Sequence, residues 1–263
     1  GCHLTLAPSR WTMDQLHEWG YHRLRRWARG VDSTRFNPAR RSDAMRATLL
    51  NGRDPNALLC IYVGRVATEK RIELLLEVAR TPGVALTIIG DGARRDELER
   101  IFEGTGTHFT GYLFGDDLAD AYASADAFMF TGTQETFGQV VQEALASGLP
   151  AVIINQGGIV DLVEHGETGF ICPDDPAAFA AAAVALRDDI ALRRRLSANA
   201  RRAAEAAPWE AIMAQLEGHY REAALMNERH TRWYTPRPAA PPRFMQTIIQ
   251  RGQEWFEGIA HGR

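Results

Sequence analysis

The sequence contains little cysteine and little excess charge. Cys2, Cys60 and Cys172 are the only cysteines among 263 residues, and their spacing matches no metal site. Because three cysteines cannot all pair with one another, a reducing, cytoplasmic compartment is expected. Cys60 lies inside an apolar segment and is predicted to be a core residue. The net charge of −3 gives no reason to expect nucleic-acid binding.

Long apolar runs are absent as well. None reaches the ~20 residues that a membrane-spanning helix needs, and no segment resembles a signal peptide. A hydrophobic content of 45% and a charged content of 24% instead indicate a soluble globular protein. The arginine clusters at 193–195 and 201–202 lie in alanine-rich helical stretches. We therefore interpret them as solvated helix faces rather than as a nucleic-acid patch.

Short apolar segments alternate with helical patterns through the middle of the chain. The expected strands are 58–63, 85–89, 108–110, 127–130, 151–154 and 170–172. The expected helices are 72–78, 96–102, 118–123, the segment that contains Glu143, and 160–163. Strands that are apolar throughout and joined by helices predict a parallel sheet covered on both faces. Right-handed crossovers then give a doubly wound, Rossmann-like α/β domain.

The two ends of the chain differ from this middle part. Residues 1–28 predict a strand end, a turn and a helix, and are interpreted as the end of one domain. Residues 29–230 begin with an irregular connector and form the Rossmann-like domain, with an all-helical pattern after residue 176. Residues 231–263 hold a proline-rich linker and a helical tail. The apolar face of that tail is expected to pack on another domain, with a membrane contact as the alternative.

Glu135 begins a predicted strand-to-helix turn at 135–138, and Glu143 lies in the helix that follows it. A helix start offers unpaired N–H groups and a partial positive charge, which suit a phosphate. Carboxylates beside it can accept hydrogen bonds from sugar hydroxyls. Phosphate plus polyol is the chemistry of a nucleotide-sugar site. The alternative is a solvated helix face whose acidic residues favour the helix dipole.

Other loops follow strands at the same edge of the sheet, where ligands of open parallel sheets bind. Arg65 and Lys70 follow the first strand and can reach a diphosphate. The alternative interpretation of these two cations is that they form surface ion pairs with Glu69 and Glu73.

Two glycine pairs also lie in such loops. Gly90-Asp91-Gly92 lacks the third glycine of a dinucleotide fingerprint, so a tight turn is sufficient to explain it. Gly157 and Gly158 permit a ligand to approach the backbone closely.

Taken together, these pieces resemble the C-terminal half of a GT-B glycosyltransferase of family 4 (group 1). The matching pieces, within roughly residues 29–225, are Gly64-Arg65 with Glu69-Lys70, 90–92, 109–112, 123–126, 135–138 with Glu143-Ala144, 148–150, 157–158, 166–169 and Pro208-Trp209. Each piece alone is weak, but their order and spacing are specific. The segments 69–71, 109–112 and 131–139 resemble glycolipid-forming members, namely sulfoquinovosyl-diacylglycerol synthases and GDP-mannose-dependent α-mannosyltransferases.

The resemblance implies a role for each matched position. Glu135, Arg65 and Lys70 form the implied catalytic set: Glu135 contacts the donor sugar, and the two cations neutralise the diphosphate. The implied donor-binding residues are Gly64, Arg65, Lys70, Tyr112, Glu135, Thr136, Phe137, Gly138, Gln139 and Glu143. In this set Glu143 binds the ribose, the N–H groups of Phe137 and Gly138 hold the distal phosphate, and the loop with Tyr112 lies by the base.

The implied function is that of a retaining glycosyltransferase, a hexosyltransferase that moves a hexose from GDP-mannose or a UDP-sugar to an acceptor. A lipid-linked acceptor and a peripheral position at the inner face of the membrane are further expectations. No metal and no other cofactor is expected, and the sequence has no Asp-x-Asp pattern.

The sequence also departs from the family pattern. Asp161 stands where glutamate is more usual, which leaves its role open. Almost all of the N-terminal acceptor domain is expected to be missing, because residues 1–28 resemble only its last strand and helix. Two alternatives remain, a GT-B nucleotide-sugar epimerase and a non-catalytic donor-binding fragment.

Overall fold

The computed structural model describes residues 3–231. The linker and tail predicted for 231–263 therefore lie outside the described residues, apart from Thr231. The chain divides into two compact units, Gly1–His219 and a second that starts at Tyr220. Among residues 3–231, no helix combines the length and the apolar character needed to cross a membrane.

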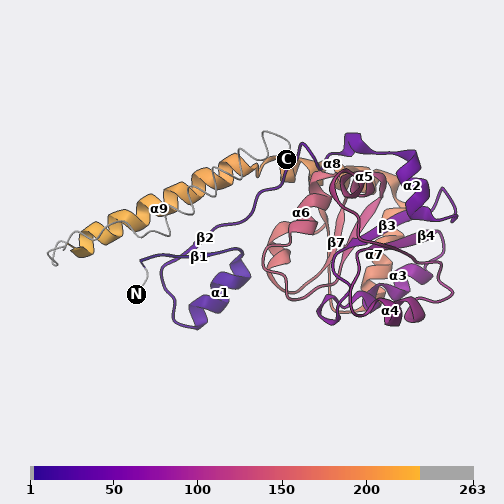
Figure 1. Ribbon diagram of the computed structural model, residues 1–263, viewed down its shortest axis with the longest axis horizontal. Coiled ribbons are helices and arrows are strands. Elements are labelled where there is room, and N and C mark those ends of the chain that lie inside the picture. The colour runs from indigo at the N-terminus through magenta and orange to yellow at the C-terminus, as the bar shows by residue number, and fades with distance from the viewer. Residues whose placement is uncertain (1–2, 232–263) are drawn as a thin grey trace. The chain divides into compact units, whose positions relative to one another are not determined.

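A six-stranded parallel sheet organises the first unit (Figure 1). Its strands are β3 (Leu58–Val63), β4 (Val84–Ile89), β5 (His108–Gly111), β6 (Ala127–Phe130), β7 (Ala151–Ile154) and β8 (Gly169–Cys172). Their spatial order is β5-β4-β3-β6-β7-β8, and every neighbouring pair is parallel. The order reverses between β3 and β6, as in a doubly wound sheet. The predicted fold class is confirmed, and all six predicted strands are present.

Helices cover both faces of this sheet (Figure 1). On one face lie α3 (Leu76–Arg80), α4 (Arg95–Ile101) and α7 (Pro176–Asp188); on the other lie α2 (Asp43–Leu50), α5 (Gly115–Ser124), α6 (Gln139–Ala146) and α8 (Ile190–Glu205). The helix predicted at 72–78 starts as a 3-10 turn, Ile72–Leu75, which follows Arg71 in a left-handed conformation. The helix predicted at 160–163 is a 3-10 segment, Gly158–Leu162.

The sequence did not predict α2, the 3-10 turn Pro38–Arg40 or the strand β2 (Leu24–Arg26). Only Leu49 and Leu50 of α2 are buried, so its apolar periodicity is weak. Ser42 caps this helix by accepting a hydrogen bond from the Met45 N–H at 3.3 Å. In β2, two arginines follow one leucine, so no apolar run marks the strand.

The N-terminal segment forms a separate two-stranded parallel sheet, β1 (Thr5–Ala7) with β2, around α1 (Arg10–Glu18). The strand end and helix predicted here are confirmed. The Arg10 N–H donates to Asp161 Oδ2 at 2.6 Å, which joins α1 to the loop after β7. A last helix, α9 (Trp209–Thr231), starts against the connector, where a Cβ on Gly30 would lie 3.0 Å from Trp209.

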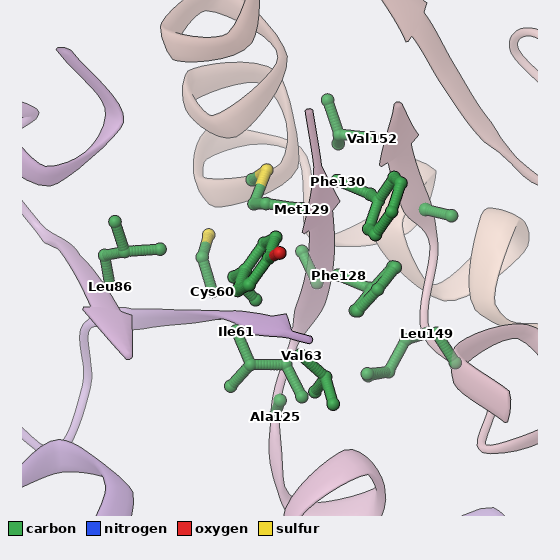
Figure 2. Packing of buried hydrophobic residues seen from close by; sticks show 14 of the residues in the cluster. Cys60, Ile61, Val63, Leu86, Ala125, Phe128, Met129, Phe130, Leu149 and Val152 are labelled. Carbon is green, nitrogen blue, oxygen red and sulfur yellow. The ribbon is translucent and has the colours of Figure 1, made fainter. Parts of the chain in front are cut away.

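A row of buried aromatic rings lies between the sheet and α5. Ring centroids are 6.0 Å apart from Tyr62 to Phe130, 6.1 Å from Phe130 to Phe128 and 5.9 Å from Phe128 to Tyr122. Figure 2 shows the side chains of β6 next to those of β3, with Cys60 among them. Cys60 is fully buried, as predicted, and burial raises the pKa of its thiol. We call the four rings of Tyr62, Phe130, Phe128 and Tyr122 the aromatic row.

The loops after β3 and β4 touch at Gly90 and Gly92. A Cβ on Gly90 would lie 1.9 Å from the Gly64 carbonyl oxygen, and one on Gly92 would lie 2.3 Å from that of Val66. The Val66 N–H also donates to the Asp91 carbonyl at 2.9 Å. Contact between two loops therefore explains this Gly-x-Gly turn.

Gly90→Ala is expected to destabilise the protein by about 1–3 kcal/mol or more, because the added methyl group overpacks this contact. Gly218→Ala is the control, since a Cβ there meets no atom within 4 Å. In helix α9 the control should stabilise by roughly 0.5–1 kcal/mol. Urea unfolding of both variants measures the difference. If both variants changed the free energy of unfolding with the same sign and size, the contact between the two loops would be contradicted.

Candidate functional site

The predicted site residues lie in loops at the carboxyl end of the sheet and in α6. Arg65 and Lys70 follow β3, Tyr112 follows β5, and Glu135 follows β6. Since β3 and β6 are neighbours at the switch point, their loops start side by side. This is the position at which doubly wound sheets bind ligands.

Lys70 and Glu135 form an ion pair across these two loops. Lys70 ends the 3-10 turn Thr68–Lys70, and its side chain is 13% exposed against 24% for Glu135. The Lys70 ammonium also lies 5.5 Å from the centre of the Phe130 ring. Glu73 pairs instead with Arg94 at 2.9 Å, so the alternative of a surface pair is wrong for Lys70.

Arg65 does form the surface pair, with Glu69. The Arg65 side chain is 65% exposed, and an exposed pair contributes only about 0–1 kcal/mol. Arg65 can therefore exchange Glu69 for a phosphate at small cost. Its backbone is anchored, because Tyr62 of the aromatic row donates to the Arg65 carbonyl at 3.2 Å. Gly64 is fixed by its N–H, which donates to the Ile89 carbonyl at 3.0 Å.

The start of α6 is open to an anion. Gly138 precedes the helix with φ +61°, and a Cβ there would lie 2.8 Å from Leu162 Cδ1. Within the described residues, no side chain caps this helix, so the first-turn N–H groups of Gln139 and Val140 are free to bind a ligand. The neighbouring Thr136 is exposed.

Phe137 is held from the other side by the connector. The guanidinium of Arg29 lies 4.3 Å from the centre of the Phe137 ring. Gln142, in the first turns of α6, donates to the Arg29 carbonyl at 2.9 Å. The turn predicted at 135–138 is thus packed against the residues that lead into the domain.

Glu143 lies one turn further along α6 in a very different environment. The phenol of Tyr122, a fully buried residue of α5, donates to Glu143 Oε2 at 3.1 Å. Burial raises the pKa of Glu143 to about 7; the Tyr122 hydrogen bond and the charge of Arg35 oppose this rise. The alternative of a solvated helix face therefore does not describe Glu143.

Tyr112 presents its ring to solvent at the end of β5. It is 53% exposed, and its hydroxyl donates to the Asp91 carbonyl at 2.9 Å. The ring stacks on Phe114, which is 72% exposed, with centroids 5.7 Å apart. The outer face of this stacked pair is an exposed apolar surface on which another aromatic ring can stack.

Gly157 and Gly158 lie where the chain approaches itself. A Cβ on Gly157 would lie 2.6 Å from the Thr133 carbonyl oxygen, and one on Gly158 would lie 2.7 Å from Ser9 Oγ. The Gly158 N–H donates to the Glu135 carbonyl at 3.1 Å. Segments of the chain therefore approach this pair closely and fix the loop that carries Glu135, while the predicted approach of a ligand stays a prediction.

Three groups beside the predicted site residues, Tyr122, Phe114 and the Asp91 carbonyl, were not predicted from the sequence. Tyr122 directly precedes the matched segment 123–126, which was the one available signal. An aromatic residue within the predicted helix 118–123 is also typical of a core position. The bond to Glu143 joins two helices, so no local pattern indicates it.

Glu143→Gln is expected to change how stability depends on pH. The folded-state pKa of about 7 lies above the usual 4.5, so protonated Glu143 favours folding. This stability is fully present below about pH 4.5 and is lost as pH rises through about 7. The stability of the native protein relative to Glu143→Gln should fall by roughly 3 kcal/mol across that range.

Urea unfolding at about pH 5 and about pH 8 measures this loss. Glu164→Gln, at an exposed position, controls for the removal of one carboxylate. The raised pKa of Glu143 would be contradicted if Glu143→Gln and Glu164→Gln changed the free energy of unfolding equally at both pH values.

Residues 50–203 match the family model described as glycosyl transferases group 1. The chain is 39% identical to the sulfoquinovosyl transferase SQD2 of Arabidopsis thaliana, over 84% of this chain and 45% of that protein. It is 40% identical to a GDP-mannose-dependent alpha-mannosyltransferase of Mycobacterium tuberculosis, over 82% of this chain and 56% of that protein. The chain therefore spans about half the length of these curated relatives.

A solved structure supports the fold. The crystal structure of Anabaena HepE in complex with UDP and glucose is similar with a TM-score of 0.72, at 22% identity, over 84% of this chain and 63% of that chain. With the six-stranded parallel sheet, this similarity confirms the Rossmann-like fold of a GT-B half. The match to the family model covers more than half of the chain. The chain belongs to the group 1 glycosyl transferases.

Proposed function

We propose that this chain binds the nucleoside-diphosphate sugar donor of a retaining hexosyltransferase. The observation that carries the proposal is the Lys70–Glu135 pair beside the uncapped start of α6. It places a cation, free N–H groups and a carboxylate within one pair of adjacent loops, which suits a diphosphate joined to a sugar. The mannosyl and sulfoquinovosyl transferase relatives, and the UDP and glucose bound in the Anabaena structure, support the same ligand class.

Each part of the donor has a partner in this proposal. The diphosphate binds Lys70, Arg65 and the N–H groups from Phe137 to Val140. The sugar hydroxyls donate hydrogen bonds to Glu135, and the ribose hydroxyls donate hydrogen bonds to Glu143. The base stacks at Tyr112, where the exposed ring of Phe114 adds a second surface. GDP-mannose or a UDP-sugar is the proposed donor.

The proposed reaction breaks the bond between the anomeric carbon and the diphosphate oxygen. The acceptor hydroxyl forms its new bond on the same face of the sugar, and its proton passes to the departing phosphate oxygen. The protein stabilises the negative charge that develops on the diphosphate. Lys70, Arg65 and the start of α6 supply the positive charge, so the proposal includes no metal and no other cofactor. A lipid-linked acceptor and a peripheral membrane contact rest on the resemblance to glycolipid-forming members.

Lys70→Ala is expected to weaken the binding of UDP and GDP by about tenfold or more, because a charge-assisted hydrogen bond to phosphate is lost. Uridine and guanosine lack the phosphates, so their binding should not change. Isothermal titration calorimetry measures all four ligands. Arg80→Ala, which removes an exposed cation at the end of α3, is the control. Equal losses for nucleosides and nucleotides would show a purely structural Lys70.

Glu135→Gln is expected to tighten diphosphate binding, because Lys70 loses the carboxylate that competes with phosphate. If the pair contributes about 1 kcal/mol, the affinity for the nucleoside diphosphate rises about fivefold. The nucleotide sugar should gain less, since its sugar also loses the charged acceptor at Glu135. Glu143→Gln, by contrast, should weaken both ligands. Titrations that give the two variants the same ligand profile would overturn this division of roles.

A further inference from the structure

Glu143 has two carboxylate oxygens in different situations. Oε2 accepts the hydrogen bond from the Tyr122 phenol at 3.1 Å. Oε1 accepts no hydrogen bond from any residue between 3 and 231, so it is free to accept one from a ligand. One oxygen is thus held by the protein, and the other remains for recognition.

Tyr122 cannot easily move away from this position. Its side chain is fully buried in α5, at the end of the aromatic row. The ring meets Phe128 of β6 with centroids 5.9 Å apart and Phe36 of the connector edge-on at 5.7 Å. Close-packed rings move only by opening cavities, so the phenol oxygen has a fixed place opposite α6.

The phenol also stays a donor. Burial, followed by the charge of Glu143, raises the pKa of Tyr122 well above its usual value. The hydroxyl therefore keeps its proton across the neutral and mildly alkaline range. A neutral donor satisfies one oxygen of the buried carboxylate without neutralising its charge, as a lysine or arginine would.

We propose that Tyr122 is the positioning residue for Glu143: its phenol holds Oε2 and so directs Oε1 toward the ribose hydroxyls of the nucleotide. This inference rests on the proposed function, because the ribose is the ligand group assigned to Glu143. Tyr122 itself touches no ligand in this arrangement. It acts by fixing the orientation of the carboxylate and by favouring its ionised form.

The pH dependence follows from the groups that face Glu143. Tyr122 faces it from α5 and Arg35 from the connector, and both favour ionisation. Tyr62, further along the aromatic row, interacts with Tyr122 rather than with Glu143. Without the phenol, only the charge of Arg35 opposes the rise in pKa that burial causes, so the pKa of Glu143 rises further. Less of the carboxylate is then ionised at neutral pH.

The test is Tyr122→Phe, with UDP, GDP and inorganic pyrophosphate titrated at several pH values. The midpoint for nucleotide binding should rise by about one pH unit, and nucleotide affinity near pH 7 should fall about fivefold. Affinity should recover in part at higher pH. Pyrophosphate, which has no ribose, should bind as it does to the native protein. Tyr62→Phe, which removes the phenol at the other end of the aromatic row, should leave the midpoint unchanged.

A direct titration of Glu143 by carbon NMR separates this inference from the proposed function. If the native protein binds no nucleotide but Tyr122→Phe still raises the Glu143 midpoint, the proposed function and the ribose contact fail, while the effect of Tyr122 on the Glu143 carboxylate stands. An unchanged Glu143 midpoint in folded Tyr122→Phe would overturn the positioning role. Should that variant not fold, Glu143→Gln gives a second test. Its nucleotide affinity should lose the pH dependence near neutrality, and a retained dependence would refute the inference.

Discussion

The aromatic row of Tyr62, Phe130, Phe128 and Tyr122 connects the core of the sheet to the candidate site. Its rings come from β3, β6 and α5, and neighbouring centroids are 5.9 to 6.1 Å apart. Both end residues carry a phenol: Tyr62 bonds the Arg65 carbonyl and Tyr122 bonds Glu143. Because such packing resists displacement, the loop after β3 and the helix α6 keep fixed positions relative to the sheet.

Two carboxylates that look alike in the sequence acquire different properties from this framework. Glu135 lies in a loop and pairs with a cation, Lys70. Glu143 lies in a helix, and its partner is an uncharged phenol, so burial raises its pKa to about 7. A phosphate can compete for the partner of Glu135, whereas the partner of Glu143 has no charge to exchange. Environment rather than residue type therefore separates the two carboxylates, for which we propose a sugar-facing and a ribose-facing role.

The glycines of the site loops serve mainly to let segments of the chain approach one another. Gly90 meets the backbone of Gly64, Gly138 lies against Leu162, and Gly158 lies against Ser9. Each contact leaves no room for a side chain at that position. Loops from β3, β4, β6 and β7 are brought together in this way. A glycine motif in a loop of this kind is thus evidence of close packing as well as of ligand approach.

The sequence by itself determined the strands and the order of the site loops. Continuous apolar runs such as 58–63 and 127–130 predicted buried parallel strands correctly, because a strand covered on both faces must be apolar along its whole length. It did not predict β2 or α2, which bury few residues. Only the tertiary structure decided the pairs Lys70–Glu135 and Tyr122–Glu143. Their members lie 65 and 21 positions apart, and crossover connections, which leave no local pattern, bring them into contact.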